Sequence, residues 1–164
     1  MEDENQQKGR GKKAISLIIL FLAITFFIAL FIFRDSLNSY ASKAMRNQVT
    51  SVVVNEEAAF IDSAFNYAKN GEGFDATFLE FGANGCSSCL RMETEMSKIK
   101  TQYPDRVNVV FVNVLQPPNQ RMMKYFGIVA IPTQVLLNKN GKESFRHTGY
   151  LSSEDILKQL NLGN

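Results

Sequence analysis

The sequence predicts an α/β protein, with a central mixed sheet flanked by helices that follows one N-terminal transmembrane helix. Three observations lead to this prediction. Residues 14–33 form an uncharged apolar run, residues 50–137 alternate between strand-like and helix-like patterns, and residues 133–148 have the pattern of two strands joined by a tight turn. Alternating strands and helices give parallel strand pairs, whereas a hairpin adds antiparallel ones.

The uncharged run at residues 14–33 predicts a membrane anchor. Its twenty residues carry no charge, and their only polar side-chain groups are the hydroxyls of Ser16 and Thr25. As a helix the run is about 30 Å long, which matches the hydrocarbon core of a bilayer. A buried core helix rarely lacks a polar face over this length, and the apolar region of a signal peptide is shorter, about 7–15 residues. The weak cleavage pattern Ser39-Tyr40-Ala41 keeps a signal peptide as the alternative.

The segments on either side of the run indicate its orientation. Residues 1–13 are polar and are expected to be disordered, and residues 34–49 are expected to be a juxtamembrane linker or stalk. Four basic residues precede the run and three follow it closely: Lys8, Arg10, Lys12 and Lys13, then Arg34, Lys43 and Arg46. The positive-inside rule therefore favours a cytoplasmic N-terminus with the folded domain outside the cytoplasm, in the periplasm of a diderm bacterium.

Residues 50–164 have the composition of one folded domain. Residues 34–164 carry 14 basic and 13 acidic residues, so the charge of this part is close to neutral. No basic stripe is present, and nucleic-acid binding therefore has no electrostatic support. A chain of this length is long enough to bury a core of its own.

The first half of the domain is predicted to alternate strands and helices. Residues 50–54 have the β-branched density of a strand, and a helix with one apolar face follows. Residues 76–81 form an apolar strand that leads to Cys86. A second helix follows, with Met92, Met96, Ile99 and Tyr103 on one stripe, and ends at Pro104. We interpret the methionine stripe as core.

The second half is predicted to end in a hairpin and a helix. Residues 107–114 form a mostly apolar strand, and a short helix over residues 121–126 ends at Gly127. The Asn140-Gly141 pair predicts a tight turn between strands at residues 133–137 and 142–148. Ser152 is a suitable cap for the last helix. The predicted order is β-α-β-α-β-α-β-β-α.

The two cysteines of the chain, Cys86 and Cys89, are separated by two residues and lie between a predicted strand and a predicted helix. A pair with this spacing suits a dithiol that opens and closes as a disulfide. The same spacing also serves as half of a zinc site. The pair alone therefore leaves both a redox role and a metal role open.

These features together resemble the thioredoxin-like superfamily, over roughly residues 50–162. Phe126 to Thr133 looks like the family segment that contains a cis-proline, and Gly149 to Ser152 looks like the approach to its final helix. Glu80, six residues before Cys86, is at the position of the family's buried carboxylate. The resemblance implies a membrane-anchored thioredoxin-like protein and a thiol–disulfide oxidoreductase of the protein-disulfide reductase type. Its redox group is the Cys86–Cys89 disulfide, with no further cofactor, and its substrates are protein thiols and disulfides.

Each site residue has an expected role. Cys86, at a helix N-terminus that stabilises an anion, is the expected nucleophile, and the deeper Cys89 is the resolving cysteine. Glu80, with its pKa raised by desolvation, is expected to transfer a proton to or from Cys89. The resemblance implies a cis bond before Pro132, which leaves the backbone of Ile131 free to pair with an extended substrate segment.

Two positions depart from the family pattern. Gly85 stands where thioredoxins carry a tryptophan, and the chain has no tryptophan at all. We expect Gly85 to contribute to a narrower choice of substrate. The lysine beside the family's buried acid is replaced by an apolar residue at or near Phe111. The hydroxyls of Ser87 and Ser88 favour a reductant over an oxidant, and a reductant outside the cytoplasm needs a membrane electron donor.

Two rival functions remain at this point. A metal-binding or metal-delivery module would use the thiolates of Cys86 and Cys89, although two ligands leave zinc short of its usual four. A partner-specific docking domain would carry the disulfide without using it. His147, the single histidine, is interpreted as a surface residue of the last strand.

Overall fold

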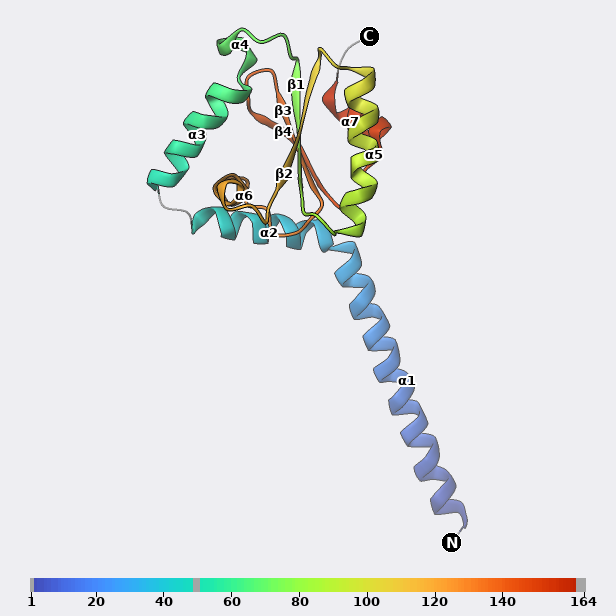
Figure 1. The fold of residues 1–164 in the computed structure, drawn as a ribbon. Coiled ribbons are helices and arrows are strands. Elements are labelled where there is room, and N and C mark those ends of the chain that lie inside the picture. Colours follow the sequence, from blue (N-terminus) through green and yellow to red (C-terminus); the bar gives the residue numbers. More distant parts are fainter. Residues whose placement is uncertain (1, 49–50, 162–164) are drawn as a thin grey trace. The chain divides into compact units, whose positions relative to one another are not determined.

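The computed structural model describes residues 2–48 and 51–161 of the 164-residue chain. The chain divides into two compact units between Ser39 and Tyr40. The first unit holds helix α1 (Glu2–Ile32) and the beginning of α2 (Arg34–Asn47). All strands and all later helices belong to the second unit (Figure 1).

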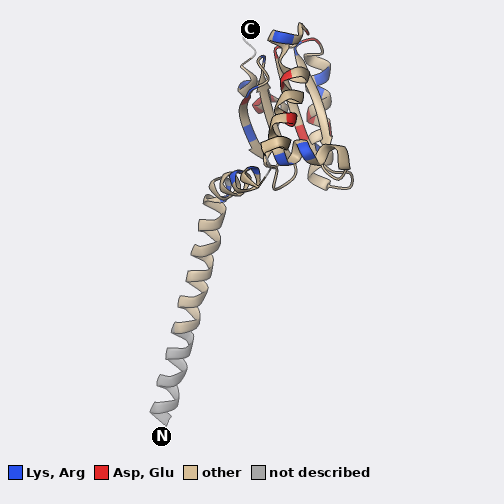
Figure 2. Cartoon of the chain, turned by 90° about the vertical axis from the view of Figure 1, so that its left-hand side faces the viewer, with Lys and Arg blue, Asp and Glu red and all other residues tan. Residues whose placement is uncertain are grey.

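The apolar run forms most of helix α1. Its stretch Ile15–Ile32 is exposed and is long and apolar enough to be a candidate membrane span. In Figure 2 this stretch has neither the blue of basic residues nor the red of acidic residues. The helix also includes residues 2–13, for which the sequence predicts disorder. These residues contain no proline, so nothing in the backbone stops a helix that the apolar run supports.

A four-stranded mixed sheet forms the middle of the second unit, as the sequence predicts. The spatial order is β2-β1-β3-β4. β1 pairs with β2 in parallel, and β3 pairs with β1 and β4 in antiparallel. The predicted tight turn is present, and Gly141 has a φ of 69° there. The strands are β1 (Ala76–Gly82), β2 (Val107–Asn113), β3 (Thr133–Asn138) and β4 (Glu143–Thr148).

Helices cover both faces of this sheet (Figure 1). One face carries α5 (Ser87–Gln102) and α7 (Ser153–Leu160), and the other carries α3 (Ser51–Phe65) and α6 (Gln120–Phe126). The predicted cap of the last helix is confirmed, because the Ser152 hydroxyl accepts a hydrogen bond from the backbone N–H of Asp155. Two short helices complete the domain: α4 (Tyr67–Asn70) and the 3₁₀ turn η1 (Pro117–Asn119).

Alternation along β1 sends its side chains to different layers. Leu79 and Phe81 belong to the buried cluster shared with α3 and α6. Phe78 belongs to the cluster shared with α5 and α7, where the predicted methionine stripe lies buried. Because successive strand residues point to opposite faces, Glu80 and Gly82 face α5 and α7 together with Phe78.

The strand predicted at residues 50–54 is wrong for the part that the structure describes. Ser51 to Val54 form the first turn of α3, and residues 49–50 lie outside the described residues. The β preference of three consecutive valines is weak beside tertiary packing, and Ile61 and Phe65 of the same helix are buried in the core. Over the described residues the sheet therefore has four strands and not the expected five, and β2 pairs only with β1.

The second half of α2 packs on the domain, although the sequence predicts a spacer there. Ser42 is 6% exposed, and its carbonyl oxygen lies so close to Gly127 that a Cβ at that glycine would collide with it. Gly127 also has a φ of 64°, so both conformation and contact favour glycine. Small residues make this contact, which is why a search for apolar positions does not reveal it.

Candidate active site

The two cysteines lie at the junction of β1 and α5. The strand ends at Gly82, and Cys86 caps the helix that begins at Ser87. The Sγ atom of Cys86 accepts a hydrogen bond from the backbone N–H of Cys89 at 3.3 Å, where a capping oxygen usually lies. The free N–H groups and the helix dipole at this end stabilise negative charge on that sulfur.

Cys86 and Cys89 are joined by a disulfide, and their Cα atoms are 5.2 Å apart. Cys89 is 1% exposed, whereas Cys86 is half-buried. The hydroxyl of Ser88 lies 3.3 Å from the Sγ atom of Cys86. An approaching disulfide therefore has easier access to Cys86 than to Cys89.

Glu80 is completely buried beneath this junction, on the face of β1 that α5 covers. Desolvation raises the pKa of its carboxyl group to about 8, although a hydrogen bond from Gln134 acts in the opposite direction. Its neighbour on β2 is Phe111, so an apolar ring occupies the position where the resemblance leads one to look for lysine. Burial therefore favours the protonated form of this carboxyl group.

Gln134 is a site residue that the sequence analysis missed. It lies opposite Glu80 on β3, is completely buried, and directs its amide Nε2 at the carboxylate, 3.1 Å from Oε2 and 3.4 Å from Oε1. The available signal was a glutamine inside an otherwise apolar stretch of strand. Its meaning depends on the pairing of two strands that are 54 residues apart in the chain.

Gly82 lies close to Cys89 and Phe111. A Cβ at Gly82 would lie 2.7 Å from the Phe111 ring and 3.4 Å from the Cβ of Cys89. Gly82 stands two residues from Glu80 on the same face of β1. Cys89 therefore lies in the same layer as the buried acid.

Ile131 and Pro132 belong to the same end of the sheet. The bond between them is cis. The next residue, Thr133, pairs with Phe81 near the end of β1, from which the chain continues to the cysteines. The carbonyl oxygen of Pro132 accepts a hydrogen bond from the backbone N–H of Gly149 at 2.8 Å, which links this loop to the one before α7.

Comparison with known proteins identifies the family. A family model described as a thioredoxin-like domain matches residues 61–164, more than half of the chain. The chain belongs to the thioredoxin-like family. It is a thioredoxin-like redox domain that carries a disulfide-forming cysteine pair and follows one apolar helix that is a candidate membrane span.

Curated relatives agree with this membership. The chloroplastic thioredoxin-like protein HCF164 of Arabidopsis thaliana is 29% identical over 99 residues, which are 60% of this chain and 38% of that protein. Its counterpart in Oryza sativa subsp. japonica is 33% identical over 84 residues, 51% of this chain and 32% of that protein. Thioredoxin 2 of Plasmodium falciparum is 30% identical over 79 residues, 48% of each chain. The aligned part of this chain spans less than half the length of each of these relatives.

A solved structure supports the fold. The exposed lipoprotein thioredoxin Etrx1 of Streptococcus pneumoniae superposes with a TM-score of 0.50 at 20% identity. The superposition covers 56% of this chain and 87% of the other. The thioredoxin fold expected from the sequence is therefore present.

Gly85 of this thioredoxin-like domain is exposed in the turn before Cys86. Its φ is 83°, a left-handed conformation that side chains rarely adopt, and a Cβ there would meet no atom within 4 Å. The conformation, and not a lack of space, therefore favours glycine at this position. Because glycine has no side chain, nothing projects from this position beside Cys86.

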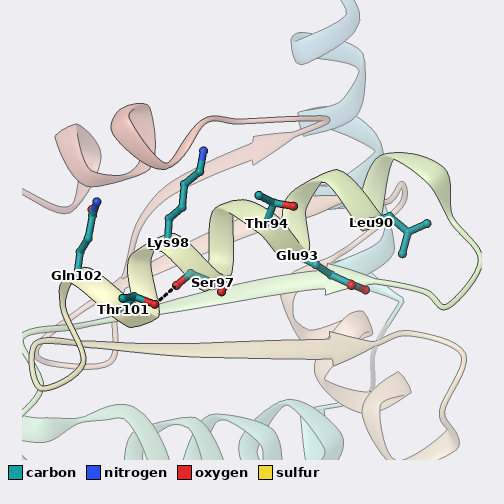
Figure 3. A pocket seen from close by; sticks show the side chains of 7 residues that line it. All are labelled: Leu90, Glu93, Thr94, Ser97, Lys98, Thr101 and Gln102. Atoms are coloured by element: carbon teal, nitrogen blue, oxygen red, sulfur yellow. Dashed lines mark hydrogen bonds between the residues drawn. The ribbon is translucent and has the colours of Figure 1, made fainter.

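Two other features lie apart from the cysteines. A hollow on the outer side of α5 is lined by residues of that helix alone, and the only hydrogen bond drawn there joins the Thr101 hydroxyl to the Ser97 carbonyl oxygen at 2.9 Å (Figure 3). It includes none of the predicted site residues. In the described part of the chain, no group of three or more His, Cys, Asp or Glu side chains is arranged to hold a metal ion.

Proposed function

We propose that this protein is a membrane-tethered thiol–disulfide oxidoreductase that reduces disulfides of extracytoplasmic proteins. The observation that carries the proposal is the Cys86–Cys89 disulfide at the start of α5, above the buried carboxyl group of Glu80, in a thioredoxin-like fold. In this proposal residues 14–33 span the bilayer, residues 34–49 link this span to the domain, and residues 50–164 form the catalytic domain.

The reaction begins with the reduced dithiol. The Cys86 thiolate attacks a substrate disulfide, forms a mixed disulfide and releases one substrate thiolate. The Glu80 carboxylate then accepts the proton of the Cys89 thiol. The Cys89 thiolate attacks Cys86, which closes the intramolecular disulfide and releases the second substrate thiolate. Two electrons pass from the protein to the substrate, and the released thiolates take up protons from Glu80 and from water.

Differences in exposure support these roles. Cys86 is half-buried and accepts a backbone hydrogen bond at a helix N-terminus, whereas Cys89 is 1% exposed. Attack from outside suits the first sulfur, and resolution from within suits the second. Ile131 and Pro132, at the same end of the sheet, together with the turn at Gly85, form the surface that receives the substrate segment.

Each turnover leaves the protein oxidised, so a reductant must restore the dithiol. Outside the cytoplasm the proposed source is a membrane protein that passes electrons across the bilayer. The orientation rests on the four basic residues before the apolar run against three after it. Trapping the thiols in living cells tests the direction: a mostly reduced pair supports a reductase, and a mostly oxidised pair contradicts it.

The activity itself is tested with the full-length protein in lipid nanodiscs. Insulin reduction in the presence of dithiothreitol should be accelerated by the wild type and lost in Cys86→Ser. Cys89→Ser should accumulate a mixed disulfide through Cys86. Full activity in Cys86→Ser would sink the proposal.

A metal titration tests the rival function. In the absence of oxygen, the reduced protein is titrated with zinc or copper(I). Weak binding without a fixed stoichiometry agrees with a redox role. Tight binding of one ion per chain, with no insulin reduction, would favour the metal module instead.

A further inference from the structure

Glu80, Gln134 and His147 form a row across three strands. Gln134 of β3 is the paired neighbour of Glu80 on β1 and of His147 on β4. Directly opposed residues of adjacent strands point to the same face of a sheet, so all three face α5 and α7. Glu80 and Gln134 are completely buried, and His147 is half-buried. Gln134 therefore separates the acid from the rim of the sheet.

Only the Nε2 atom of the Gln134 amide has a hydrogen-bond partner among the described residues. Its Nε2 contacts both oxygens of Glu80, the geometry of a donor to an ionised carboxylate. Its Oε1 atom is buried and has no hydrogen-bond partner among the described residues. Buried amide oxygens are normally paired, so an unpaired one beside a titrating group calls for an explanation.

The hydrogen-bonding properties of the Glu80 carboxyl group and the Gln134 amide explain the unpaired Oε1 atom. A protonated carboxyl group has an O–H to donate, which an ionised one lacks, and the amide oxygen is the acceptor that the O–H needs. Rotation of the amide about its last side-chain bond exchanges Nε2 for Oε1 at the same position. One glutamine can thus hydrogen-bond to both charge states of Glu80.

We propose that Gln134 is the positioning residue for proton transfer at Glu80: Nε2 donates to the carboxylate, and after rotation Oε1 accepts from the protonated acid. This inference rests on the proposed function only in linking Glu80 to the thiol of Cys89. The amide keeps the carboxyl group in one place while its charge changes. Phe111, the neighbour of Glu80 on β2, has no polar group that could hydrogen-bond to the carboxyl group.

The neighbours of Glu80 on each element are few. Its paired residues are Phe111 on β2 and Gln134 on β3. On the α5 side, Cys89 lies close to Gly82, two residues along β1 from Glu80. The pKa of Glu80 is raised by desolvation and lowered by Gln134. The half-buried ring of His147 lies one strand further away, on β4. Among the described residues, Gln134 is thus the side chain that hydrogen-bonds to this acid.

The inference is tested on the oxidised full-length protein in nanodiscs, without substrate. Infrared spectroscopy follows the band of the protonated carboxyl group against pH, and its loss in Glu80→Gln assigns it. Gln134→Met keeps the volume of the side chain and removes both hydrogen bonds. We expect the titration midpoint of Glu80 to rise by about one pH unit and the carboxyl band to move to higher frequency.

Thr133→Val is the matched control. It removes the hydroxyl of the preceding residue on β3, which hydrogen-bonds to Ala130 and Thr148 and not to Glu80. The control should leave the midpoint and the band unchanged. An unchanged midpoint in Gln134→Met, or an equal change in Thr133→Val, would overturn the inference. Gln134→Leu repeats the measurement if the methionine variant does not fold.

The test separates this inference from the proposed function, because no electron transfer is measured. A shifted midpoint in a protein that does not reduce insulin keeps the role of Gln134 and removes the proposed activity. If the protein reduces insulin but Gln134→Met leaves the titration midpoint of Glu80 unchanged, the proposed activity stands and the role of Gln134 is removed. In an active protein, Gln134→Met should also move the pH profile of insulin reduction upward, and it should have no such effect in a Glu80→Gln background.

Discussion

Glu80 and Glu95 are two carboxyl groups with almost no exposed surface, and their pKa values are shifted in opposite directions. Their exposed fractions are 0% and 5%. The pKa of Glu80 is raised to about 8, whereas that of Glu95 is lowered to about 2. Desolvation acts to raise both pKa values, so burial alone does not explain why that of Glu95 is lowered.

The hydrogen-bond donors make the difference. Desolvation raises the pKa of Glu95, but bonds from Ser153, Lys98 and Tyr150 together outweigh it. The distances are 2.9 Å from the Ser153 backbone N–H, 3.0 Å from the Lys98 ammonium and 3.1 Å from the Tyr150 hydroxyl. Glu80 has one neutral amide. The several donors to Glu95 keep it ionised and link α5 to the start of α7. The single amide donor to Glu80 leaves its pKa raised.

The largest effect that tests this contrast is the pH dependence of stability caused by Glu80. Its pKa in the folded protein is raised from 4.5 to about 8, so the folded state favours the protonated acid. This contribution is fully present below pH 4.5 and is lost as pH rises through about 8. At about 1.36 kcal/mol per pKa unit, the loss is on the order of 5 kcal/mol.

Glu80→Gln removes this dependence, because an amide stays neutral and still pairs with Gln134. Urea unfolding of the oxidised full-length protein at pH 5 and pH 9, followed by tyrosine fluorescence, measures it. We expect a steeper decline in the wild type than in the variant. Equal declines would mean that Glu80 titrates normally and that the contrast with Glu95 is wrong.

Removing Glu95 gives the next effect. In Glu95→Ala the backbone N–H of Ser153 loses its acceptor in a buried place, which should cost about 2–3 kcal/mol in the free energy of unfolding at pH 7. Glu93→Ala is the matched control, an exposed carboxylate on the same helix that should change stability by less than about 0.5 kcal/mol. Similar losses in the two variants would remove the special role of Glu95.

Glu95 should make the protein less stable as pH falls, whereas Glu80 should make it less stable as pH rises. Its folded-state pKa is lowered from 4.5 to about 2, so its contribution is present above pH 4.5 and is lost as pH falls towards 2. The effect is smaller because Lys98, one of its donors, is half exposed. Thermal unfolding at pH 6 and pH 3 should show a larger drop in the wild type than in Glu95→Gln. The same drop in both would assign the acid sensitivity elsewhere.

The smallest predicted effect belongs to Tyr150. Tyr150→Phe removes one hydrogen bond to Glu95 from a ring that is 42% exposed, and it should lower the melting temperature less than Glu95→Ala does. The guanidinium of Arg91, 5.0 Å from the ring centre, keeps its contact in the variant. A melting temperature equal to that of the wild type would mean that Ser153 and Lys98 alone hold Glu95.

Local patterns predicted most of the fold and the reactive pair. The cysteine spacing, the turn at Gly141 and the methionine stripe can be recognised within a few neighbouring residues. Gln134 and Glu95 were not recognised, because their meaning comes from partners more than fifty residues away in sequence. The valines at residues 52–54 misled the strand prediction because tertiary packing outweighs β preference at a helix end.

Gly82 leaves room for an aromatic ring on the face of β1 that holds the buried acid. Its single hydrogen lets the edge of the Phe111 ring close over the end of β1, where a methyl group would lie 2.7 Å from that ring. A ring pushed outward would open a route for solvent towards Glu80. Gly82→Ala is therefore expected to alter the burial of Glu80, and with it the pKa of that carboxyl group, without changing any group that hydrogen-bonds to it.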